Sequence, residues 1–199
     1  MRRPAALLVP AAVLAMGAGV GAGAQETAVT QSLGVNGSTP QVCAVLTGRF
    51  RTGELVNFRG SDGDTLRVLE LIDPQTLAAQ SARATVMLEG VCNFPHRIRL
   101  ESQDNGLWPI SGPVAPTSPD FATALPYRAS FAWANRTGEI EADAKVRHPR
   151  QTLAEIDGPA AGDMLIDIEL DEGASNTQIG APVLAGAYSD TLRIYLEPR

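Results

Sequence analysis

The pattern that most limits the fold is a strict alternation of side chains near the C-terminus. Leu192, Ile194 and Leu196 are separated by polar or amphipathic residues. Successive side chains of a β-strand point to opposite faces of the sheet, so this period of two predicts a strand between a core and water. Pro198 should end that strand, because proline cannot donate to the hydrogen-bond ladder. If the strand lies at a sheet edge, its free backbone groups need a partner from elsewhere.

Similar runs recur along the chain, separated by Gly, Pro, Asn and Asp at about the spacing found in β-sandwiches. Strands are expected over 42–46, 65–72, 84–92, 97–102, 127–133, 139–146 and 164–171. Segment 50–58 should be irregular or an edge strand, and a turn is expected over 135–138. Residues 73–76 are compatible with the cap of a short helix over 77–84 or with a loop. No long amphipathic helix pattern appears, so the sequence predicts an all-β sandwich.

The first residues have the features of a secretory signal peptide. Arg2 and Arg3 form a positive region, an apolar run covers residues 5–20, and Ala22-Gly23-Ala24 matches a cleavage site. We therefore expect residues 1–24 to be removed on export. A transmembrane helix is the alternative, and the many small residues and the cleavage motif disfavour it.

Residues 25–40 are expected to form an extension ahead of a single domain over 41–199. One strand face of the extension would hold Val29, Gln31, Leu33 and Val35. The run 36–40, Asn-Gly-Ser-Thr-Pro, is typical of a flexible break. A strand-competent segment on a loose tether is therefore predicted, with a frayed terminus as the alternative.

The two cysteines, Cys43 and Cys92, are expected to form a disulfide, because an even count in an exported chain favours pairing. They are 92 − 43 = 49 positions apart, and closing such a loop is worth about 4 kcal/mol. Two buried free thiols are the alternative. A metal site is disfavoured because the distant cysteines and the two histidines, His96 and His148, match no ligand spacing. No cofactor is expected.

The charge balance disfavours nucleic acid and anionic membranes as partners. The chain has 16 basic and 22 acidic side chains and a net charge of −6, which becomes −8 without Arg2 and Arg3. An acidic domain without a basic stripe matches neither partner. The basic cluster within 145–150 is expected to be a solvated loop. No second apolar run is long enough for membrane insertion.

No set of residues predicts catalysis. His96 lies in a predicted turn and should be solvated, and the serines lack a nucleophile elbow. Asp167, Glu169 and Asp171 share a strand face and could serve sugar hydrolysis or calcium binding, but a plain solvent face is favoured. Trp108 could stack on a sugar or, more simply, anchor its own loop. The sequence therefore favours a protein that is not an enzyme.

Three features occur together in this exported chain. Cys43 lies in the first strand of the domain, Cys92 ends the run Val86-Met87-Leu88-Glu89-Gly90-Val91-Cys92, and a final strand begins Gly186-Ala187-Tyr188-Ser189-Asp190-Thr191-Leu192. This combination resembles the spore coat protein U family, which includes the pilin subunits of archaic chaperone–usher pili. The most specific positions are Gly186, Tyr188 and Asp190.

The resemblance implies an incomplete immunoglobulin-like β-sandwich that lacks its last strand and carries an N-terminal donor strand. A periplasmic chaperone would lend a strand, and an outer-membrane usher would then join identical or related pilin subunits by β-strand addition. The donor residues would be Val29, Gln31, Leu33 and Val35. The acceptor groove would border Leu192, Ile194 and Leu196. The product would be an adhesive pilus, secreted through the periplasm to the cell surface, for adhesion or biofilm formation.

Two other functions fit the same sequence. A stand-alone secreted coat or matrix protein of this fold would fill the groove with its own N-terminal segment, in cis rather than in trans. A carbohydrate-binding module would use Trp108 and the acidic strand face.

Overall fold

The computed structural model describes residues 30–60, 65–111 and 119–199. The expected signal peptide, 1–24, and the expected donor residue Val29 lie outside these residues. Thr39–Arg199 forms one compact unit, and the chain up to Ser38 belongs to a separate one.

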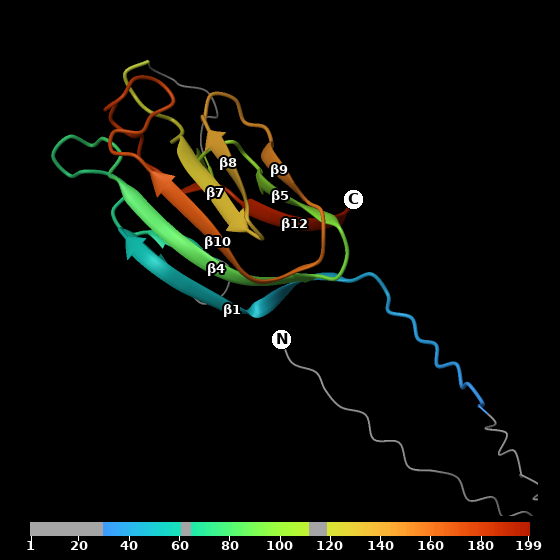
Figure 1. Cartoon of the computed structure of the whole chain (residues 1–199). Helices are drawn as coiled ribbons and strands as arrows, with labels where there is room; N and C mark the ends of the chain where they lie inside the picture. Colours follow the sequence, from blue (N-terminus) through green and yellow to red (C-terminus); the bar gives the residue numbers. More distant parts are fainter. Residues whose placement is uncertain (1–29, 61–64, 112–118) are drawn as a thin grey trace, which may run out of the picture. The chain divides into compact units, whose positions relative to one another are not determined.

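The compact unit is built from two main sheets, and no helix occurs in the described residues. The first sheet has the order β1 (Cys43–Val56), β4 (Ala82–Cys92), β10 (Ala160–Leu170), β7 (Tyr127–Trp133) and β8 (Arg136–Ala142). The second has the order β12 (Leu192–Pro198), β5 (His96–Ser102) and β9 (Arg150–Ile156). Figure 1 shows the two layers, with β5, β9 and β12 behind the larger sheet. The all-β prediction is confirmed.

Two short ribbons complete the fold. β2 (Phe58–Gly60) pairs with β3 (Leu66–Val68), and β6 (Trp108–Pro109) pairs with β11 (Tyr188–Ser189). All strand pairs in the two main sheets are antiparallel.

The core lies between the two main sheets and follows the alternation of the sequence. Ile98 and Leu100 of β5 are fully buried, whereas Arg97, Arg99 and Glu101 point outward. On the opposite sheet, the buried side chains of β7 are Tyr127, Ala129, Phe131 and Trp133. Both sets follow the period of two in the sequence, because a strand packed on one face buries every second residue.

The helix considered over 77–84 is absent, and the loop alternative is correct. The Asp73 carboxylate does accept the backbone N–H groups of Gln75 and Thr76, both at 2.8 Å, as a helix cap would. Leu77 then has a φ of 60°, a left-handed value that no helix can continue. The chain is therefore turned back, and it enters β4 at Ala82.

The strand predicted over 65–72 is limited to Leu66–Val68. Asn57 ends the ladder there, because its side chain accepts the backbone N–H of Glu70 at 2.9 Å and donates to the carbonyls of Glu70 and Ser81. These side-chain bonds replace the ladder that a longer strand would have made.

Segment 50–58 is largely an edge strand, the second of its two predicted alternatives, because β1 continues to Val56 with two register shifts. Other elements differ from the prediction: β8 ends at Ala142, and β10 begins at Ala160. β9 was not predicted at all. The turn expected over 135–138 occurs earlier, because Ala134 and Asn135 have φ values of 47° and 59° and form a two-residue hairpin. Gly138 is therefore a strand residue.

This placement of Gly138 gives a prediction about stability. A Cβ atom at Gly138 would overlap the ring of Phe131, which is buried in the core. We expect Gly138→Ala to lower the free energy of unfolding by about 1–3 kcal/mol, since crowding in a packed core displaces its neighbours. Urea unfolding curves would measure the loss.

Gly158→Ala is the matched control, because a Cβ atom there would meet nothing within 4 Å. It should change the free energy of unfolding by less than about 0.5 kcal/mol. Equal effects from the two substitutions would contradict the packing described around Phe131.

Candidate functional site

β12 forms one edge of the smaller sheet. It pairs with β5 along its whole length, and no other described strand pairs with it. Its inward side chains, Leu192, Ile194 and Leu196, pack against the core but remain partly exposed. Leu100 and Ile98, which lie opposite Ile194 and Leu196 on β5, are 0% exposed. Among the strands that the structure describes, β5 is the one paired neighbour beside the apolar row of β12.

β1 forms the neighbouring edge of the larger sheet. It pairs with β4 and with no other described strand of that sheet. β1 and β12 also approach each other, although they belong to different sheets. Two strand edges, with a partly exposed apolar row beside them, therefore lie on the same side of the sandwich. Unpaired edges of this kind can accept an additional strand.

The outer face of β12 is held to β5 by charged groups. Glu197 accepts hydrogen bonds from Arg97 Nε at 3.0 Å and from Arg99 Nη2 at 2.6 Å. The Arg99 guanidinium also lies 3.7 Å from the centre of the Tyr195 ring. The hydrogen bond from Arg99 is the main cause that lowers the pKa of Glu197 below its usual value. β5 therefore holds β12 through these side-chain contacts as well as through backbone hydrogen bonds.

Asp190, one of the three motif residues, gathers donors from several elements. One carboxylate oxygen accepts Ser102 Oγ at 2.5 Å and the Tyr127 hydroxyl at 2.7 Å. The other accepts the backbone N–H of Thr191 at 2.6 Å and of Asp104 at 3.0 Å. Burial, followed by the charge of Asp190, raises the pKa of Tyr127 well above its ordinary value. The motif aspartate therefore links β5, β7 and the start of β12.

The other two motif residues have smaller roles. The Tyr188 hydroxyl donates to the Leu184 carbonyl at 2.7 Å, and the ring packs against the core. Burial raises the pKa of Tyr188. Nothing in the structure explains a glycine at position 186.

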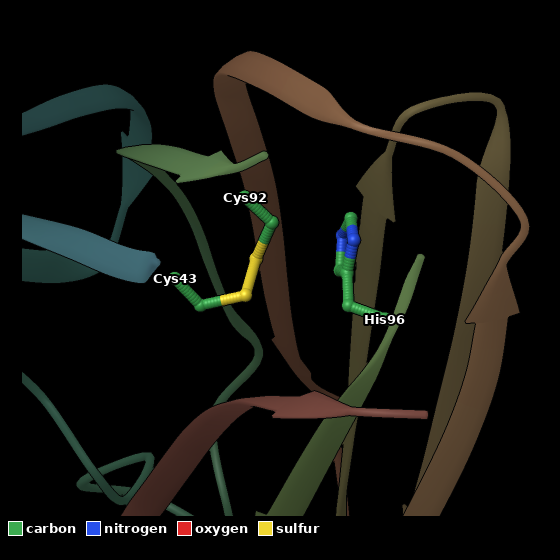
Figure 2. A group of neighbouring side chains, drawn as sticks. All are labelled: Cys43, Cys92 and His96. Carbon is green, nitrogen blue, oxygen red and sulfur yellow. A yellow bond between two sulfur atoms is a disulfide. The ribbon is translucent and has the colours of Figure 1, made fainter. Parts of the chain in front are cut away.

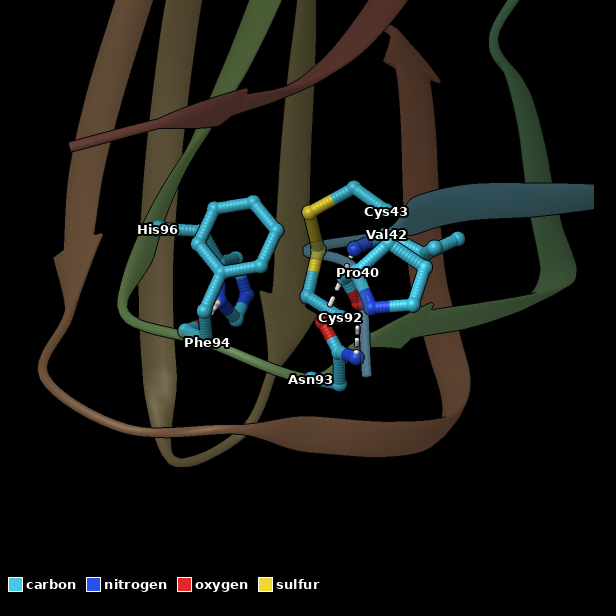
Figure 3. The surroundings of a disulfide bond; sticks show 7 residues. All are labelled: Pro40, Val42, Cys43, Cys92, Asn93, Phe94 and His96. Atoms are coloured by element: carbon cyan, nitrogen blue, oxygen red, sulfur yellow. Dashed lines mark hydrogen bonds between the residues drawn. A yellow bond between two sulfur atoms is a disulfide. The ribbon is translucent and has the colours of Figure 1, made fainter. Parts of the chain in front are cut away.

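The expected disulfide between Cys43 and Cys92 is confirmed. The two residues lie directly opposite each other on β1 and β4. Asn93 holds the same strand ends together, because it accepts the Val42 N–H at 2.8 Å and donates to the Pro40 carbonyl at 2.8 Å (Figure 3). A covalent and a hydrogen-bonded link therefore fix the start of β1.

The expectation that His96 is solvated is wrong. His96 is the first residue of β5, is 0% exposed, and has its ring centre 5.1 Å from that of Trp133. The turn that was expected to expose it is short, and Phe94 is itself buried. His148 is exposed, in the loop that holds the basic cluster.

Trp108 is 3% exposed, which leaves no ring face for a sugar to stack on. It packs with Ala124 and Ala144 in a small second cluster. The loop-anchoring interpretation of this residue is correct. A carbohydrate-binding module that uses Trp108 is therefore not supported by the structure.

The acidic face of β10 is occupied by ion pairs. Glu169 pairs with Arg83 and Arg128, Asp171 pairs with Arg128, and Asp167 accepts the Thr85 hydroxyl at 2.6 Å. Hydrogen bonds from Arg128 and then Arg83 lower the pKa of Glu169. Because arginines pair with Glu169 and Asp171, the structure favours a solvent-facing, ion-paired strand face over a site for sugar hydrolysis or calcium binding.

The expected donor residues that the structure describes lie outside any strand. Gln31, Leu33 and Val35 are exposed, and Leu33 has an exposed fraction of 89%. No strand occurs between residues 30 and 42. The structure thus contains an apolar segment that is not packed on its surroundings.

Ser102, Tyr127 and Asn93 were not predicted as parts of a site. For Tyr127 a signal existed, since a tyrosine on a buried strand face needs a partner for its hydroxyl. Nothing in the sequence showed that this partner would be Asp190, more than 60 positions away.

No protein-family model matches the chain, and no curated protein matches it. The described residues contain no helix with the length and hydropathy of a membrane span. Fold and site together define a disulfide-bonded all-β protein with two adjacent strand edges.

The Asp190 network predicts a large effect of a small substitution. Asp190→Asn replaces one acceptor oxygen by an NH₂ group, which would face donors from Ser102, Tyr127 or the backbone. We expect a loss of about 1–3 kcal/mol in the free energy of unfolding, because buried donors lose their acceptor. Chemical denaturation would measure it.

Asp163→Asn is the control for the same change of charge on an exposed carboxylate. Asp163 lies opposite Glu89 on β4, so removing its charge should be neutral or slightly stabilising. A neutral effect of Asp190→Asn would show that the network does not support the fold.

The lowered pKa of Glu197 predicts a dependence of stability on pH. The folded state holds this carboxylate ionised to lower pH than the unfolded state does, so it binds fewer protons. The stabilisation is therefore present above the ordinary value near 4.5 and is lost as the pH falls below it. Glu197→Gln should show a shallower loss of stability as the pH falls below about 5.

Arg99→Gln should also make the loss of stability at low pH shallower, since Arg99 is the main cause of the lowered pKa of Glu197. The double variant should show less than the sum of the two effects, because the partners are in contact. If Glu197→Gln and the wild type lost stability equally steeply with falling pH, Glu197 would not be a source of the pH dependence.

Proposed function

We propose that this protein is the structural subunit of a secreted adhesive pilus, assembled by donor-strand complementation. The domain is an incomplete immunoglobulin-like sandwich, and its missing strand is supplied by another subunit. A periplasmic chaperone holds the acceptor groove before assembly, and an outer-membrane usher joins the subunits. The chaperone and the usher are inferred from the family resemblance, which rests on the cysteine positions and the motif at 186–192.

The observation that most supports this proposal is the state of β12. Its inward row is half-buried, whereas the paired residues of β5 are fully buried. A further strand laid along β12 would place apolar side chains over Leu192, Ile194 and Leu196. Full burial of each large apolar side chain contributes about 1.5–3 kcal/mol, so several such contacts would hold two subunits together.

The N-terminal extension has the chemistry of the missing strand. Leu33 and Val35 are exposed at 89% and 88%, and in an extended donor strand they would share one face with Gln31 and Val29. Pairing in trans leaves the extension of each acceptor subunit free for the next groove. Such a head-to-tail contact does not close on itself and therefore propagates as a fibre.

The proposal predicts multimers that depend on Leu33. The full chain would be produced in a bacterium with an oxidising periplasm and run unheated on a denaturing gel. The wild type should give a ladder of multimers that disappears on heating. Leu33→Asp should abolish the ladder, because a carboxylate cannot be buried unpaired in an apolar groove.

Ile179→Asp is the matched control. Ile179 is 91% exposed and belongs to the loop between β10 and β11, so it is part of neither the donor segment nor β12. Its substitution should leave the ladder intact, whereas Ile194→Asp on β12 should remove it. A wild-type chain that stays monomeric would instead indicate a self-complemented coat or matrix protein and would reject the pilus subunit.

A further inference from the structure

Three side chains with metal-ligating atoms meet at one end of the sandwich. A ring nitrogen of His96 and the sulfur atoms of Cys43 and Cys92 all lie within 4.8 Å of one another. Figure 2 shows the imidazole beside the disulfide, with the three residues coming from β1, β4 and β5. In the oxidised chain the two sulfurs are bonded to each other and are not available as ligands.

The hydrogen bonds of His96 leave one nitrogen free to act as a ligand. Nδ1 lies 2.7 Å from the Phe94 carbonyl oxygen. A carbonyl can only accept, so Nδ1 carries the proton and Nε2 of the neutral ring holds a lone pair. Nε2 is buried and has no hydrogen-bond partner in the described residues. Histidines that bind metals usually have this arrangement, with the other ring nitrogen donating to a carbonyl or carboxylate.

We propose that the reduced chain binds a zinc-type divalent ion through Cys43, Cys92 and His96. A thiol or phosphine reductant supplies two electrons, the S–S bond breaks, and each sulfur takes up a proton. Binding of the ion then releases both protons and forms two metal–thiolate bonds and one metal–imidazole bond. Two thiolates with one imidazole are a ligand set that suits zinc, and water would complete a tetrahedron.

The geometry requires only local movement. Zinc–sulfur bonds are about 2.3 Å and zinc–nitrogen bonds about 2.0–2.1 Å, so tetrahedral ligand atoms lie roughly 3.5–4 Å apart. The sulfurs must separate from their bonded distance, and the ring nitrogen, which lies within 4.8 Å of both, must move closer to them. Cys43 is partly exposed, which gives the fourth position access to water.

Reduction should not separate the ligands, because other bonds hold the strand ends. Asn93 donates its backbone N–H to the Val42 carbonyl at 3.1 Å and clamps Val42 and Pro40 through its side chain. The ladder between β1 and β4 continues beyond the cysteines. Both thiols therefore stay beside His96 when the crosslink is lost.

Metal binding and the disulfide exclude each other. Thiolates bound to an ion are not free to react with an oxidant such as dioxygen or a disulfide, so the bound ion should slow reoxidation of the cysteines. This property does not depend on the proposed function in pilus assembly, and the test below uses no multimer.

Cobalt(II) is a suitable probe, since tetrahedral thiolate coordination gives it characteristic absorption. The full chain would be reduced anaerobically with a phosphine and titrated with Co²⁺. We expect one equivalent to bind, with a thiolate-to-cobalt charge-transfer band and intense visible bands of a tetrahedral ion. Zn²⁺ should displace it, and the oxidised chain should show neither band.

Two variants test whether His96 in particular contributes to metal binding. His96→Gln should weaken Co²⁺ binding by more than about tenfold, because loss of a ligand should cost at least as much as loss of its supporting hydrogen bond. His148→Gln, at the exposed histidine, should bind as the wild type does. Equal affinities for the two variants, or octahedral spectra for the reduced wild type, would overturn the proposal.

X-ray absorption of the zinc-loaded wild type gives a readout that needs no variant, in case His96→Gln does not fold. Two sulfur ligands and one imidazole are expected. A shell without imidazole, or with sulfur from more than one chain, would reject the site.

Discussion

The carboxylate of Asp190 is the interaction on which the arrangement of the two sheets most depends. It lies just before β12 in the smaller sheet, yet it accepts a hydrogen bond from Tyr127 of the larger one and from Ser102 of β5. A single acidic group thus fixes how the last strand begins and where it lies relative to both layers. Asp190 therefore has a structural role, because it joins residues that are far apart in the sequence.

The sequence was most informative where one face of a strand is buried. The alternation in β5, β7 and β12 identified their inward residues, since a period of two has only two phases. It failed where individual side chains redirect the backbone. Asn57 and Leu77 changed the course of the chain between β3 and β4, through side-chain hydrogen bonds to the backbone and a left-handed residue. β9 was missed because its inward residues are weakly apolar, and Ile156 is the one residue of this strand that is buried.

The candidate site was predictable in part for the same reason. The row on β12 and the cysteine pair follow from local patterns, whereas the burial of His96 does not. His96 follows Cys92 by only four positions, but the tight turn through Phe94 places it inside the sandwich rather than at the surface. The disulfide and the proposed metal site therefore occupy one position, and the redox state of the chain selects between them.

The one-sided attachment of β12 has a consequence for motion within the folded state. β4 is paired along both of its edges, by β1 and β10, whereas β5 is the one described strand that pairs with β12. β12 can therefore separate as a unit without breaking the larger sheet. Its amide hydrogens should exchange with solvent through a partial opening of low free energy, while those of β4 exchange only on global unfolding.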